Sequence, residues 1–126
     1  MKSTVFLTLE EVLVLHAELV RRFGGSGGIR DRGLLESALA RPRTGYYETL
    51  SLQAAALLQS LCQNHAFIDG NKRVAFAATA IFLRMNGHDL MASADDAEHF
   101  LVERAIVGRA PLDEIASWLE SHLRPT

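Results

Sequence analysis

The chain has 126 residues, of which 48% are hydrophobic, and its 13 Lys and Arg residues against 15 Asp and Glu residues give a formal net charge of −2. This length and apolar content predict one globular domain, residues 1–126, and exclude a disordered chain. This charge argues against direct binding to nucleic acid or to a membrane surface. No segment has the pattern of a signal peptide or of a membrane span, so we expect a cytoplasmic protein.

The N-terminal third predicts two helices joined by a glycine-rich connector. Residues 8–23 carry apolar side chains at helical spacing, and Thr8 and Glu11 form a capping-box pattern at their start. Residues 24–28 contain four glycines and lack the Lys-Ser or Lys-Thr that would follow in a phosphate-binding loop, so we expect a flexible connector. A second helix is expected over residues 31–40, because an aspartate can cap its start and a proline follows its end.

Residues 43–50 lack helical periodicity and predict a loop or a short extended flap. Tyr46 and Tyr47 lie in this segment and can hold a target peptide by strand addition. The alternative interpretation is that the two tyrosines pack the loop onto the core.

Two consecutive segments, residues 51–63 and residues 71–85, are apolar on nearly all sides. A helix of this kind belongs in the middle of a domain, so we expect both to be central helices. Cys62, the single cysteine of the chain, lies in the first segment and cannot form an internal disulfide, which fits a reducing compartment.

The C-terminal third predicts a short extended piece over residues 88–91 and two further helices. One begins at Ser93 or Asp95 and reaches residue 107, where a glycine follows, and the other covers residues 111–122. Six helices with little strand predict an all-α fold, a six-helix bundle around the two central apolar helices.

The loop between the two central helices continues into the sequence His-Ala-Phe-Ile-Asp-Gly-Asn-Lys-Arg, residues 65–73. Gly70, Asn71, Lys72 and Arg73 fall at the start of the second central helix, where free N–H groups and the helix dipole attract an anion. Cations in a first helical turn oppose the dipole, so an anionic ligand is expected to offset them.

The same stretch supplies the other parts that phosphoryl-type transfer needs. His65 can take a proton from a hydroxyl near neutral pH, and Asp69 is a hard oxygen ligand suited to Mg²⁺. Phe67 would anchor the loop in the core. Each residue also has a simpler interpretation: a structural histidine, a helix cap at Asp69, and solvated surface charges at Lys72 and Arg73.

These residues match the pattern His-x-Phe-x-Asp-(Ala or Gly)-Asn-Lys-Arg of the death-on-curing (Doc) toxins within the Fic/Doc superfamily. The chain resembles these toxins beyond the motif as well. Residues 24–42, with their Gly-Ile-Arg-Asp and Leu-Glu-Ser-Ala-Leu-Ala-Arg-Pro runs, and residues 81–87 are similar to the corresponding Doc stretches. The resemblance covers most of the chain and implies a Fic/Doc-like bundle.

The resemblance implies the toxin of a type II toxin–antitoxin pair, a kinase that uses ATP and Mg²⁺ to phosphorylate a hydroxyl of elongation factor Tu and so inhibits translation. By match of position, His65 would be the base, Asp69 the Mg²⁺ ligand and Phe67 the loop anchor. The residues implied to hold the phosphates are those that open the second central helix: Gly70, Asn71, Lys72 and Arg73.

Two positions bear on which group is transferred. Lys72 stands where Fic AMP-transferases typically carry glycine, which favours the Doc-type reaction, whereas Gly70 is the Fic choice where some Doc proteins carry alanine. A kinase is therefore our prediction and AMP transfer the alternative. A catalytically inactive helical module, whose cationic loop grips an acidic partner, is a third hypothesis.

The mode of inhibition can also be predicted. The nearest match to the self-inhibitory motif of some Fic proteins, residues 44–48, lacks the final residue of the pattern. We therefore expect an antitoxin in trans that resembles the Phd type, with a flexible tail that buries apolar surface in a groove of the toxin.

Two further residues received structural interpretations. We expect His16 to be half-buried or on the surface. We expect Arg30 to form a surface ion pair with Asp31 or Glu36, and reaching the nucleotide or the antitoxin is its alternative role.

Overall fold

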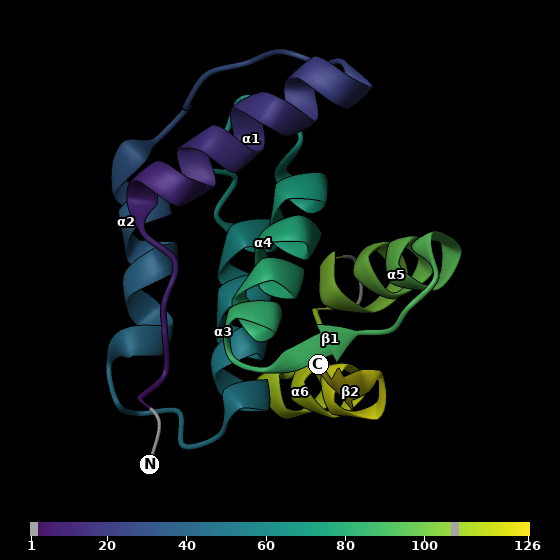
Figure 1. Ribbon diagram of the computed structural model, residues 1–126. Helices are drawn as coiled ribbons and strands as arrows, with labels where there is room; N and C mark the ends of the chain where they lie inside the picture. The colour runs from purple at the N-terminus through teal and green to yellow at the C-terminus, as the bar shows by residue number, and fades with distance from the viewer. Residues whose placement is uncertain (1–2, 107–108) are drawn as a thin grey trace.

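The computed structural model describes residues 3–106 and 109–126, and the regular elements in these ranges are mostly helical (Figure 1). The all-α prediction is confirmed. In chain order the elements are α1 (Leu9–Phe23), α2 (Arg32–Ala40), a 3-10 turn (Arg41–Arg43), α3 (Leu50–Gln63), α4 (Asn71–Met85), β1 (His88–Leu90), α5 (Ala94–Phe100), a π-helical segment (Leu101–Ile106), α6 (Leu112–Ser121) and β2 (Leu123–Pro125).

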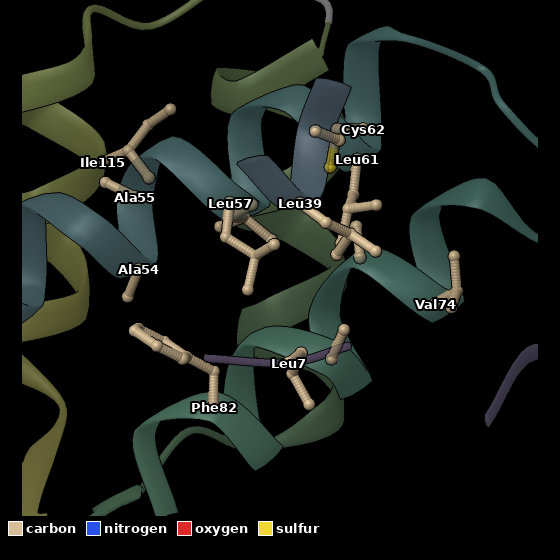
Figure 2. Packing of buried hydrophobic residues seen from close by; sticks show 14 of the residues in the cluster. Leu7, Leu39, Ala54, Ala55, Leu57, Leu61, Cys62, Val74, Phe82 and Ile115 are labelled. Carbon is tan, nitrogen blue, oxygen red and sulfur yellow. The ribbon is translucent and has the colours of Figure 1, made fainter. Parts of the chain in front are cut away.

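The two helices predicted to be central, α3 and α4, lie side by side in the middle of the bundle (Figure 1). Figure 2 shows Leu57 of α3 and Phe82 of α4 in one buried cluster that also contains Leu39 of α2 and Ile115 of α6. Alanines on α3 permit this close packing of helices. Cys62 is buried in the same core, and its burial raises the pKa of the thiol to about 12.

Side-chain caps fix where the helices begin. The Thr8 hydroxyl accepts a hydrogen bond from the Glu11 N–H, and the Glu11 carboxylate accepts one from the Thr8 N–H, so the predicted capping box is present. Asp31 caps α2 as predicted. Of the two residues proposed to cap α5, Ser93 rather than Asp95 does so.

The segment after α4 differs from the prediction in two respects. The extended piece is β1, and it pairs in antiparallel register with β2, a strand that the sequence did not indicate. The predicted helix from residue 93 is α5, but it continues as a π-helical segment to Ile106. Its expected end at residues 107 and 108 lies outside the described residues.

The end of the bundle where α4 begins positions the candidate site. There α1 crosses over the start of α4 (Figure 1), and α5 contributes Ala97 and Glu98 to the same cleft. Among the helices in the described ranges, none combines the length and the apolar content that crossing a membrane requires.

Candidate active site

An open cleft of about 880 Å³ lies at the start of α4. Its apolar walls include side chains of α1, α4 and the π-helical segment: Leu19, Phe23, Phe76, Leu101 and Val102. Its polar lining consists of Glu98 of α5 and of residues of the predicted motif: His65, Asp69, Gly70, Asn71, Lys72 and Arg73. The structure therefore brings the predicted base, acid and cations to one cleft.

The start of α4 is open towards this cleft. Gly70 is the N-cap residue in a left-handed conformation, with φ of 78°, and in the described part of the chain no side chain caps the helix. The interpretation of Asp69 as the helix cap is therefore wrong. Uncapped first-turn N–H groups and the positive end of the helix dipole favour an anion at this position.

The Asp69 carboxylate is held by main-chain groups rather than by cations. One oxygen accepts a hydrogen bond from the Gly70 N–H at 2.9 Å, and the other accepts one from the Ser26 N–H of the glycine-rich connector at 3.2 Å. A Cβ on Gly25 would lie 2.7 Å from the Asp69 carboxylate, so the glycine lets the connector approach closely. The connector thus positions the acid.

Asn71 holds the shape of the motif loop. Its side-chain oxygen accepts a hydrogen bond from the Phe67 N–H at 3.0 Å, and its side-chain nitrogen donates to the Phe67 carbonyl at 3.0 Å. The Phe67 ring is only 2% exposed. The Asn71 side chain therefore fixes the main chain of the loop at Phe67.

Arg30 secures the other side of the loop. Its guanidinium donates to the carbonyls of His65 at 2.6 Å and Asn64 at 3.0 Å, so the expected surface ion pair with Asp31 or Glu36 is wrong. His65 has a positive φ of 51°, which costs a non-glycine residue about 1–3 kcal/mol and persists only where surrounding contacts hold it. With its main chain held in this way, the exposed His65 side chain lines the cleft.

The two cations of the first turn have partners within the chain. The Lys72 ammonium lies 3.2 Å from a carboxylate oxygen of Glu98 on α5, and the Arg73 guanidinium lies 4.8 Å from the ring centroid of Phe23 on α1. These side chains are exposed, so both contacts are weak and an anion in the cleft can compete for the cations.

Comparison with known proteins supports the resemblance of this chain to the Doc toxins. The Fic/DOC family pattern matches residues 6–83, which include α1, the connector, the motif loop and most of α4. The chain belongs to the Fic/DOC family. Toxin Doc of Mycolicibacterium smegmatis is 44% identical over 122 residues, which cover 92% of each chain. Protein kinase doc of Escherichia phage P1 is 32% identical over 114 residues, which cover 87% of this chain and 89% of that protein.

Within this family the chain is a Doc protein, as the motif predicted. The family match covers the motif residues that line the cleft but ends before α5. Glu98, the partner of Lys72, therefore comes from a part of the chain that the family pattern does not describe.

His16 is a residue of the site that the sequence interpretation missed. It is 4% exposed, its ring stacks on Phe67 with centroids 3.9 Å apart, and its Nε2 lies 2.7 Å from the Asp69 carbonyl oxygen. The expectation of a half-buried or surface histidine is wrong. Its position one turn after buried Val12, on the apolar face of α1, was the signal that could have revealed it.

The structure does not bring Tyr46 and Tyr47 to the cleft. They lie before the first residue of α3, whereas the motif loop follows its last residue, and a helix of 14 residues separates them by about 20 Å. Tyr47 accepts a hydrogen bond from Arg41 and Tyr46 is 80% exposed. The segment beside the motif loop is instead the end of the connector, since the Gly28 carbonyl accepts a hydrogen bond from the Ile68 N–H at 3.2 Å and the next residue, Ile29, pairs with Phe67.

Proposed function

We propose that this chain is the toxin of a type II toxin–antitoxin pair and acts in the cytoplasm as a protein kinase. It transfers the γ-phosphate of ATP to a hydroxyl of a translation factor, elongation factor Tu, and so halts translation and growth. The observation that carries the proposal is the uncapped start of α4, which bears Lys72 and Arg73 in the same cleft as His65. The names of the two relatives, Toxin Doc and Protein kinase doc, support it.

The phosphates of ATP occupy the start of α4. The main-chain N–H groups of the first turn bind their oxygens, Lys72 contributes a point charge, and Arg73 offers a planar pair of donors. Gly70 has no side chain between the phosphates and the backbone. Binding takes Lys72 away from Glu98 and Arg73 away from the Phe23 ring.

The residues fit a Mg²⁺ ion that enters with the nucleotide. Asp69 lines the cleft, and its carboxylate accepts hydrogen bonds from two N–H groups. The carboxylate oxygens have further lone pairs that can bind a metal. In the ranges that the structure describes, no group of three or more His, Cys, Asp or Glu forms a metal cage. One carboxylate together with phosphate oxygens is the usual protein site for Mg²⁺, which when bound neutralises part of the phosphate charge.

His65 acts as the general base. Its imidazole takes the proton of the target hydroxyl while that oxygen forms a bond to the γ-phosphorus and the bond from this phosphorus to the leaving ADP oxygen breaks. The hydrogen bonds from Arg30 to the His65 and Asn64 carbonyls keep the imidazole at the cleft during this transfer.

AMP transfer through the same base is the alternative, and Gly70 is the residue that favours it. In that reaction the hydroxyl attacks the α-phosphorus and pyrophosphate leaves. Lys72 favours the kinase, because it puts bulk and charge where AMP-transferases keep a glycine.

We further propose that a Phd-like antitoxin inhibits the toxin by burying its flexible tail in the cleft. Phe23 and Ile68 are large apolar side chains that line the cleft and are 62% and 59% exposed. Exposed apolar surface of this kind marks a binding groove, and a disordered tail that folds on binding must bury such surface.

Growth arrest in cells tests the catalytic proposal against the inactive binding module. We expect the His65→Ala variant to lose growth arrest while it still binds the antitoxin, because the side chain is exposed and packs in no core. Arrest that persists in this variant would contradict an enzymatic toxin.

A further inference from the structure

His16 of α1 forms a hydrogen bond to the motif loop. Because the imidazole is buried, loss of this hydrogen bond would leave a buried polar group without a partner, which costs stability. The two partners are 53 residues apart in the chain, and the Nε2 of His16 lies 2.7 Å from the carbonyl oxygen of Asp69. A carbonyl oxygen only accepts, so Nε2 carries the proton. Stacking of the imidazole on Phe67, with an angle of 12° between the rings, fixes the direction in which this N–H points.

The hydrogen bond from His16 fixes the orientation of the whole Asp69–Gly70 peptide and not only that of the Asp69 carbonyl. In a trans peptide the C=O and the following N–H point in opposite directions, so anchoring the Asp69 carbonyl at His16 sets where the Gly70 N–H points. That N–H donates to the carboxylate of Asp69 at 2.9 Å. The direction of the carboxylate therefore depends on the peptide that His16 holds.

We propose that His16 is a positioning residue for the candidate active site. By holding the Asp69–Gly70 peptide, it sets the direction of the Gly70 N–H and, through the hydrogen bond from this N–H, the direction of the Asp69 carboxylate that lines the cleft. The proposal rests on the proposed function in so far as Asp69 is the Mg²⁺ ligand. Removal of a group that orients a metal ligand typically lowers metal affinity or activity by about 10- to 100-fold.

Two substitutions separate this role from simple core packing. His16→Phe keeps a flat ring against Phe67 but removes the donor, whereas His16→Gln keeps an N–H donor at a similar reach. Val12→Ala is the matched control, because Val12 is buried one turn earlier on the same face of α1 and Asp69 is not among its hydrogen-bond partners. It tests what loss of α1 packing does by itself.

The first readout is the binding of Mg²⁺ with a non-hydrolysable ATP analogue, measured by calorimetry. We expect His16→Phe to weaken the Mg²⁺-dependent binding by about 10- to 100-fold and His16→Gln to recover most of that loss. Val12→Ala should lower the melting temperature and leave the Mg²⁺ dependence unchanged. Equal Mg²⁺ dependence in wild type and His16→Phe would overturn the proposal.

The second readout uses the free protein and needs no nucleotide. Nitrogen-15 NMR of the wild type should show His16 protonated at Nε2, and the Gly70 amide resonance should shift in His16→Phe and return towards its wild-type position in His16→Gln. A His16 protonated at Nδ1 alone, or a Gly70 amide that does not move, would overturn the proposal. If the wild type binds no nucleotide, the proposed function fails, while these NMR results still decide the role of His16.

Discussion

Lys72 and Glu98, which both line the cleft, form an ion pair with 3.2 Å between the Lys72 ammonium and a Glu98 carboxylate oxygen. The pair joins the first turn of α4 to α5. Since the phosphates of a nucleotide would take the place of the Glu98 carboxylate, this residue competes with the proposed substrate for the same cation.

The first prediction is that Glu98→Gln tightens nucleotide binding. An exposed pair is worth up to about 1 kcal/mol, so the ATP dissociation constant should fall by about two- to fivefold with little change in stability. Calorimetric titration of the nucleotide measures this, with Glu103→Gln as the control, because it removes the same charge from an exposed position that does not line the cleft. Unchanged affinity in Glu98→Gln would show that the pair does not compete.

Substitution of Asn71 and of its neighbour Lys72 should affect different properties of the protein, the first its stability and the second its nucleotide binding. Asn71→Ala removes both hydrogen bonds to the Phe67 main chain and should lower the free energy of unfolding by about 1–3 kcal/mol. Lys72→Ala should change stability by less than about 1 kcal/mol while it weakens nucleotide binding. Urea denaturation and nucleotide titration of both variants separate the two roles. A stable Asn71→Ala variant would contradict the loop-holding role.

Gly25 and Gly24 test whether the connector positions the acid. Both have positive φ, so alanine at either position should cost a similar backbone strain, about 1–3 kcal/mol. A Cβ at Gly25 would collide with the Asp69 carboxylate at 2.7 Å, whereas a Cβ at Gly24 meets nothing within 4 Å. Gly25→Ala should therefore raise the Mg²⁺ concentration needed for half-maximal transfer, and Gly24→Ala should not. Equal Mg²⁺ curves for the two variants would refute this account.

Phe23 and Val14 test the antitoxin groove. Both are exposed apolar residues of α1, but only Phe23 lines the cleft. Phe23→Ser should weaken binding of the antitoxin tail by more than about tenfold, the effect expected of a buried aromatic anchor, while Val14→Ser should leave it unchanged. Fluorescence anisotropy with a labelled tail peptide gives both affinities. If Val14→Ser is the variant that weakens binding, the tail lies elsewhere.

The parts of this fold that depend on local chemistry were predictable from sequence. Thr8 with Glu11, and Asp31, cap their helices because capping needs only residues three positions apart. The central helices followed from their all-round apolar character. The anion site at the start of α4 was predictable for the same reason, since the motif residues are close in sequence and lie at one helix start.

The missed features all depend on partners distant in sequence. His16 finds its acceptor at Asp69, and Arg30 finds carbonyls at residues 64 and 65, which no local pattern reveals. β2 has three residues, too few for an alternating pattern, and exists because β1 lies beside it. Tyr46 and Tyr47 were suggested as a target-peptide flap because their segment lacks helical periodicity, but the length of α3 separates this segment from the motif loop.

The most direct test of the central claim is to incubate the purified protein with purified elongation factor Tu and ATP labelled at either the γ- or the α-phosphate, with His65→Ala as control. The account predicts label on elongation factor Tu from the γ-position alone, and none with His65→Ala. Label from the α-position would mean AMP transfer, and no label from either position, with growth arrest intact in cells, would contradict a kinase that acts on this target.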